Sequence, residues 1–140
     1  MKTNKATRKI VRERAKGFCE YCLSPVEFSP GPFAAEHTIP TARGGDDALE
    51  NLAFSCQGCN GHKFTAVDAL DPVTKLIAPL FNPRQERWNE HFEWSADFLF
   101  IIGTSPTGRA TVERLQFNRP NLVNLRRALL AIDMHPAMVL

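Results

Sequence analysis

Four cysteines stand in two pairs that share one spacing, Cys19-Glu20-Tyr21-Cys22 and Cys56-Gln57-Gly58-Cys59. Each CxxC turn can direct two sulfurs toward one point, and four thiolates make a closed tetrahedral zinc site. The 33 residues between the pairs exceed the spacing of a compact zinc ribbon, so we expect an inserted segment. Redox-active dithiols and unrelated free thiols are the alternatives. A closed four-thiolate site leaves no open position for substrate, so this zinc would hold structure and not do chemistry.

A second set of residues, in and after the inserted segment, combines a carboxylate, an imidazole, two amides and two cations. These are Glu36, His37, Arg43, Asn51, Asn60 and Lys63. Carboxylate and amide oxygens are hard ligands suited to Mg²⁺ or Mn²⁺, and a neutral histidine beside them can act as a general base on water. Arginine and lysine can contact phosphate oxygens. Together they are the parts for phosphodiester hydrolysis.

Each of these residues also has a simpler interpretation. His37 taken alone is typical of a surface or hydrogen-bonded histidine, and Asn51 is typical of a turn or a cap. Asn60 can be a helix N-cap. Arg43 and Lys63 can be solvated charges.

The order and spacing of these residues resemble the HNH endonuclease family. The shared elements are Glu36-His37, Pro40, Arg43-Gly44-Gly45, Asn51-Leu52, Cys56-x-x-Cys59-Asn60 and Lys63, and the resemblance covers about residues 8–66. Later segments, which include Pro79–Arg84 and Thr107–Val112, are similar to the tails of short stand-alone bacterial members. That second similarity carries no assigned chemistry.

The resemblance implies a ββα-metal fold, in which a two-stranded ribbon and a helix grip one catalytic divalent ion. It implies that His37 is the general base, that Glu36 and Asn60 are metal ligands, and that Asn51 fixes the loop and orients the base. The ion would stabilise the scissile phosphate and the leaving oxygen. The acidic position is usually Asp in the family, and Asn60 replaces the namesake histidine. An amide ligand favours Mg²⁺ or Mn²⁺ over a second zinc.

The formal net charge of +2 taken alone argues against a strongly basic nucleic-acid binder, but the charge is unevenly distributed. Residues 1–16 hold seven basic residues and one acidic residue, and residues 109–127 hold five basic residues and one acidic residue. Residues 17–108 hold five basic and twelve acidic residues. We therefore expect the two basic flanks to face DNA phosphates, although solvated helix faces explain the same pattern.

The chain shows no apolar run at residues 1–20 that would suit a signal peptide. It has no stretch of about 18 apolar residues that would span a membrane. We expect a cytoplasmic protein, because thiols stay reduced there and are available to a metal.

Several elements follow from periodicity and turn signals. Val11, Ala15 and Phe18 predict a helix over residues 5–16 that stops at Gly17. Extended segments are expected at 34–39 and 51–54, a short strand around 26–28, and a helix from Asn60 to about Leu70. Further on we expect strands around 92–94 and 98–102, a helix over 110–117, and a last helix that begins at Pro120.

The whole sequence thus predicts an α+β fold of 140 residues in one domain, with a ββα-metal core at about 8–70 and an α/β extension at about 71–140 packed on it. The predicted function is a metal-dependent DNA endonuclease. The alternatives are a non-catalytic zinc-braced nucleic-acid-binding module and a zinc-stabilised protein-interaction domain. A homodimer stays open, since cutting both strands often needs two active sites.

Overall fold

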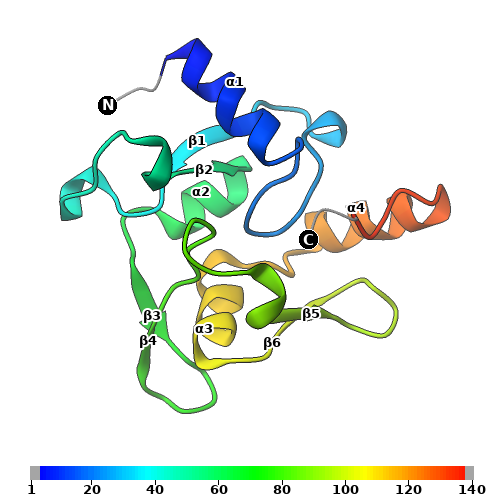
Figure 1. The fold of residues 1–140 in the computed structure, drawn as a ribbon. Helices are drawn as coiled ribbons and strands as arrows, with labels where there is room; N and C mark the ends of the chain where they lie inside the picture. Colours follow the sequence, from blue (N-terminus) through cyan, green and yellow to red (C-terminus); the bar gives the residue numbers. More distant parts are fainter. Residues whose placement is uncertain (1–3, 138–140) are drawn as a thin grey trace. The chain divides into compact units, whose positions relative to one another are not determined.

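The computed structural model describes residues 4–137, which combine four α-helices with three two-stranded antiparallel sheets (Figure 1). The expected α+β class is confirmed. These residues form two compact units, one of residues 4–67 with 82–86 and one of residues 68–81 with 87–137. No helix in this described part is long and apolar enough to cross a membrane.

The first unit is built around a two-stranded ribbon. Strand β1 (Ala34–His37) pairs antiparallel with β2 (Leu52–Ser55), and His37 lies opposite Leu52. All four residues of β2 are buried. Helix α2 (Gln57–Lys63) follows β2 after a single residue. The expected ββα arrangement is therefore present.

Helix α1 (Lys5–Arg14) packs against the ribbon and confirms the expected first helix. Asn4 caps it by accepting a hydrogen bond of 2.8 Å from the backbone of Thr7. Val11 is fully buried, while the cationic side chains of the helix are exposed. Arg14 ties the helix to the segment that enters β2, because its guanidinium donates to the carbonyl of Leu52 at 2.6 Å.

Helix α2 differs from the expected helix at 60–70. It begins at Gln57, because the second CxxC forms its first turn and Cys56 is its N-cap. It ends at Lys63, where a tight turn at Phe64 reverses the chain. Residues 68–70 form a strand instead of the end of a helix.

The second unit contains two hairpins and two helices. Strand β3 (Asp68–Leu70) pairs with β4 (Ile77–Pro79), and β5 (Phe92–Trp94) pairs with β6 (Ile101–Gly103). Helix α3 spans Pro106–Leu115 and α4 spans Pro120–Ala131. The buried core of this unit is largely aromatic and aliphatic, and it includes Phe81, Trp88, Phe92, Ile101, Leu115 and Phe117.

Two boundaries and one element type in these predictions are wrong. Helix α3 begins at Pro106 and not near 110, because the hydroxyl of Ser105 accepts from the backbone of Gly108 at 2.9 Å and caps it. The strand expected at 98–102 begins only at Ile101, since the preceding residues form the hairpin turn. Residues 26–28 form one 3₁₀ turn instead of a strand.

The basic residues of 109–127 are largely used inside the second unit. Arg109 forms a bidentate pair with the buried carboxylate of Asp71, with both nitrogen–oxygen distances at 2.9 Å. This pair lowers the pKa of Asp71. Arg126 is buried and donates to two backbone carbonyls, and Arg119 donates to the carbonyls at the end of α3. These contacts do not support the expectation that this flank faces phosphates at these three arginines.

Candidate functional site

The four cysteines come together as the sequence predicts. Their sulfurs all lie within 4.8 Å of one another and all four residues are buried. Those of Cys22 and Cys56 are 3.7 Å apart, which matches the edge of about 3.8 Å of a tetrahedron with Zn–S bonds of about 2.3 Å. Among residues 4–137, this is the only group of three or more His, Cys, Asp or Glu residues with ligand atoms so close. The cluster could hold zinc.

The thiols of the cluster perturb one another strongly. Hydrogen bonds from Cys19, Cys22 and Cys59 lower the pKa of Cys56. Burial raises the pKa of Cys19 and of Cys59. Crowded, buried sulfurs that compete for protons are the setting in which a divalent cation gains most by replacing those protons.

Glu36 occupies the inner face of β1 and is only 6% exposed. Its Oε2 accepts a hydrogen bond of 2.7 Å from the hydroxyl of Tyr21, and its Oε1 lies 2.7 Å from the ammonium of Lys63. Oε1 accepts no hydrogen bond of regular geometry, so the contact with Lys63 is an ion pair. Burial raises the pKa of Glu36, and Lys63 opposes that shift.

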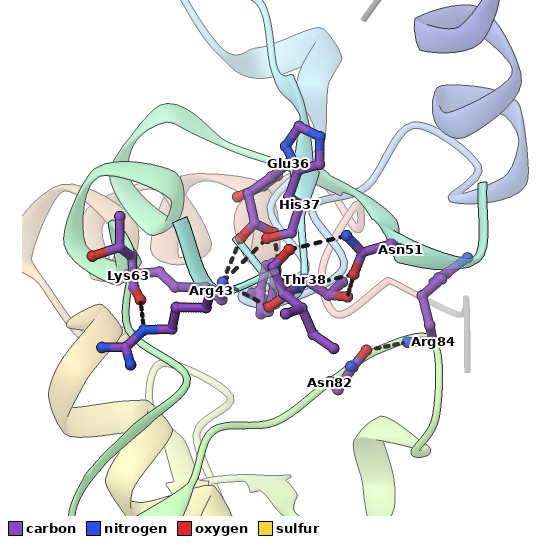
Figure 2. A network of polar contacts seen from close by, with 12 residues as sticks. Glu36, His37, Thr38, Arg43, Asn51, Lys63, Asn82 and Arg84 are labelled. Carbon is purple, nitrogen blue, oxygen red and sulfur yellow. Dashed lines mark hydrogen bonds and ion pairs between the residues drawn. The ribbon is translucent and has the colours of Figure 1, made fainter. Parts of the chain in front are cut away.

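Lys63, the last residue of α2, is 2% exposed. Besides Glu36, its ammonium contacts the backbone carbonyls of Thr38 at 3.1 Å and His37 at 3.3 Å (Figure 2). Lys63 therefore fastens the end of α2 to the end of β1. A side chain in this position does not face solvent, so the geometry does not support the expected contact between Lys63 and phosphate.

His37 points to the opposite face of β1 from Glu36, as neighbours in a strand do. Its Nε2 lies 2.7 Å from Oδ1 of Asp47, and the two side chains are 16% and 36% exposed. A carboxylate only accepts hydrogen bonds, so Nε2 is the donor in this contact, and Nδ1 is the nitrogen that can accept a proton in the neutral imidazole. Asp47 was missed in the sequence. Its only signal there is an acidic pair directly after Gly44-Gly45.

Asn51 uses all four hydrogen-bonding positions of its amide on one loop. Its oxygen accepts from the hydroxyl of Thr38 at 2.8 Å and from the backbone of Ile39 at 2.9 Å, and its nitrogen donates to the carbonyls of Ile39 and Asp46 (Figure 2). The loop is so close that a Cβ on Gly45 would lie 1.7 Å from the Ile39 oxygen. This geometry supports the predicted loop-fixing role of Asn51.

Arg43 and Asn60 are the remaining residues that the sequence singled out. Arg43 is exposed, and its Nε donates to the carbonyl of Thr65 at 2.7 Å, which anchors the guanidinium by one edge (Figure 2). In the described part of the chain its terminal nitrogens have no partner. Asn60 lies half-buried inside α2, and because Cys56 is the N-cap of that helix, the N-cap interpretation of Asn60 is wrong.

Arg84 contributes to this unit from far along the chain, and no motif in the sequence predicts its role. Its guanidinium pairs with Oε1 of Glu20, while Oε2 of Glu20 accepts from the backbone of Phe54 at 2.8 Å. Burial lowers the pKa of Arg84 to about 10, and nearby Arg14 adds to that shift. Segment 82–86 thus braces β2 and the first CxxC turn.

A hollow of about 300 Å³ lies beside the loop that follows His37. Its lining includes the carboxylate residues Asp46 and Glu50 and the amide residues Asn51 and Asn82, with no lysine or arginine among the residues that line it. An anionic phosphate would be repelled there. The exposed guanidinium of Arg43 therefore suits contact with a substrate phosphate, and this hollow does not.

Comparison with known proteins gives one match. The family model described as HNH endonuclease matches residues 19–65. This range includes the four cysteines and all six residues of the second set. No curated protein and no solved structure matches the chain significantly.

Proposed function

We propose that this chain, whose residues 19–65 match the HNH endonuclease family model, is a metal-dependent endonuclease that hydrolyses phosphodiester bonds of DNA. The observation that supports this proposal most is the contact between His37 and Asp47 at 2.7 Å. It orients the imidazole and leaves Nδ1 to take a proton from water, which is what a general base needs.

In the proposed reaction, Nδ1 of His37 removes a proton from a water molecule whose oxygen attacks the phosphorus. The bond from phosphorus to the 3′ oxygen breaks as the new bond forms. Arg43 holds a non-bridging phosphate oxygen through its terminal nitrogens. Asp47 stabilises the imidazolium that results. Asn51 holds the loop that follows β1, the strand that ends at His37.

The proposal includes a divalent ion, Mg²⁺ or Mn²⁺, with Glu36 and Asn60 as its protein ligands. Oε1 of Glu36 suits this role because it is a buried carboxylate oxygen that accepts no regular hydrogen bond. Its contact with the Lys63 ammonium at 2.7 Å means that the ion would share the carboxylate with Lys63. A bound ion would supply Lewis-acid stabilisation of the charge that develops on the phosphate and the leaving oxygen.

The proposal assigns structural zinc to Cys19, Cys22, Cys56 and Cys59, whose sulfurs lie within 4.8 Å of one another. It assigns the enzyme to the cytoplasm, where thiols stay reduced. If both DNA strands are cut, the proposal favours a homodimer, because cutting both strands often takes two active sites.

The test is nicking of supercoiled plasmid in the presence of Mg²⁺ or Mn²⁺. We expect His37→Ala to lower the rate about 10²- to 10⁴-fold, the usual contribution of a general base. His135→Ala is the matched control, since His135 belongs to the second unit, where its ring makes an edge contact with Trp94. Equal nicking by wild type and His37→Ala would refute the assignment of the base.

A non-catalytic zinc-braced nucleic-acid-binding module is the second candidate. The engagement of Glu36 by Lys63 and Tyr21 favours it, because that carboxylate is already satisfied without a metal. DNA binding by the zinc-loaded wild type, without cleavage of double-stranded, single-stranded or structured DNA under either metal, is the result that would select it.

A further inference from the structure

Phe64 occupies a backbone conformation that normally requires glycine. The backbone of Ala66 donates to the carbonyl of Lys63 at 3.0 Å, which closes a four-residue turn with Phe64 at its second position. Phe64 has φ 52° and ψ −121°. These angles are the mirror image of the first central position of a type II turn, so the turn is type II′. Glycine is the residue that a type II′ turn favours there.

The phenyl ring of Phe64 is not buried, so burial does not offset this strain. It is 73% exposed, the highest value among the large hydrophobic side chains of the described residues. A strained backbone and an exposed aromatic ring both lower the stability of the free protein. Strain of this kind persists where the neighbouring structure enforces it, and it gathers at sites of function.

The neighbouring structure that enforces the turn belongs to the candidate site. On one side of Phe64, the buried ammonium of Lys63 is fixed to the carbonyls of His37 and Thr38. On the other side, the carbonyl of Thr65 accepts the Nε of Arg43. Phe64 therefore stands one residue away from the anchor of β1 and one residue away from the anchor of the Arg43 guanidinium.

We propose that Phe64 is a base-stacking residue of the nuclease, and that its ring packs against an unstacked base next to the phosphate that Arg43 holds. The inference rests on the proposed function. DNA is the occupant that the surroundings favour, because the exposed Arg43, anchored to the carbonyl of the residue next to Phe64, complements a phosphate backbone, and every base offers a face for an aromatic ring. The type II′ turn holds the ring outward so that it meets the base without rearrangement.

The experiment uses zinc-loaded His37→Ala protein, which binds substrate without cutting it, and a DNA duplex that carries the fluorescent base 2-aminopurine. Binding should raise the fluorescence, because insertion of the ring unstacks the base. Phe64→Gly should abolish that rise and weaken binding about 5- to 100-fold, the range for loss of one stacked base. The same variant should unfold at a higher temperature, because glycine relieves the strain at φ 52°.

Phe98→Gly is the matched control. Phe98 also has a positive φ, 61°, and is 40% exposed, but it lies in the hairpin turn of the second unit. It should leave fluorescence and affinity unchanged. Phe64→Trp should keep both signals.

Three results would overturn the inference. A lower unfolding temperature for Phe64→Gly would show that the ring serves the fold. Unchanged fluorescence and affinity, in a protein whose wild type nicks plasmid, would refute the stacking role and leave the proposed function intact. A wild type that neither binds nor nicks DNA would refute both.

Discussion

Two consecutive residues of β1 have different environments because a strand directs neighbouring side chains to opposite faces. Glu36 faces inward, where Lys63 and Tyr21 neutralise and hold it. His37 faces outward, where Asp47 holds it while 16% of its side chain stays accessible. One adjacent pair thus supplies a buried, paired carboxylate and a partly accessible imidazole.

We expect Asp47→Ala to lower kcat about 10- to 100-fold and to leave KM nearly unchanged, because it removes the partner that orients the base without touching substrate. Single-turnover nicking at a series of substrate concentrations separates the two constants. Asp46→Asn is the neighbouring control, since its side chain accepts from the backbone of Ala48, a bond that an amide oxygen can keep. A wild-type kcat for Asp47→Ala would show that the histidine needs no such partner.

At the scale of elements, the four-cysteine cluster joins the loop after α1 to the start of α2. Cys56 has two duties there, because it is both a cluster member and the N-cap of α2, accepting from the backbone of Cys59 at 3.4 Å. Serine is a good N-cap and a poor zinc ligand. Cys56→Ser therefore keeps the cap and removes only the thiolate.

We expect Cys56→Ser, or removal of zinc by a chelator, to unfold the first unit. Structural zinc contributes on the order of 10 kcal/mol in small domains, which is comparable with the whole stability of such a unit. Zinc content by mass spectrometry and amide hydrogen exchange of residues 4–67 measure the effect. Re-addition of zinc should refold the chelated wild type and not the variant. A folded, zinc-free protein would contradict the structural role.

The same scale shows which elements the sequence predicts and which it does not. Helix α1 and strands β1 and β2 carry clear local signals, and their predictions are confirmed. The predicted end of α2 was wrong because phenylalanine is not a residue type that predicts a type II′ turn. Strand β3 was missed because Leu70 is 49% exposed, so its apolar side chain marks no core face.

The candidate site divides in the same way. The motif spacing was enough to select His37 and Asn51, and the resemblance to the HNH endonuclease family implied the loop-fixing role of Asn51. The partners of Glu20 and Glu36 come from residues 64 and 27 positions away, and no local pattern announces such pairs. The sequence predicts an exposed cation at Lys63. Its burial could not be predicted, because it depends on the fold that brings β1 to α2.

At the scale of the whole molecule, the net charge of +2 does not show how the environments of the cations differ between the two units. In the second unit, Arg109, Arg119 and Arg126 are bound to a carboxylate or to carbonyls. In the first unit, the lysine and arginine side chains of α1 are exposed to solvent. Lys5, Arg8 and Arg12 recur at intervals of three and four residues, so they share one face of that helix. The field that attracts DNA should therefore arise mainly from α1.

We expect the triple variant Lys5→Ala, Arg8→Ala, Arg12→Ala to reduce the slope of log K against log salt concentration by about 3, since each phosphate contact contributes about 0.9. Alanine is the best helix former and Val11 stays buried, so α1 itself should persist. Fluorescence anisotropy with the His37→Ala protein between about 50 and 200 mM salt gives the slope.

The control for that slope is the double variant Arg114→Ala, Arg127→Ala, which removes exposed cations from α3 and α4 of the second unit. It lowers the net charge by two, compared with three for the α1 variant. If attraction followed net charge alone, the two variants would reduce the slope nearly in proportion to these numbers. A slope that falls only for the α1 variant would mean that phosphates lie against that helix, since counterions are released only where cations meet the DNA backbone. An equal loss per cation in both variants would refute the assignment of the DNA-binding face to α1.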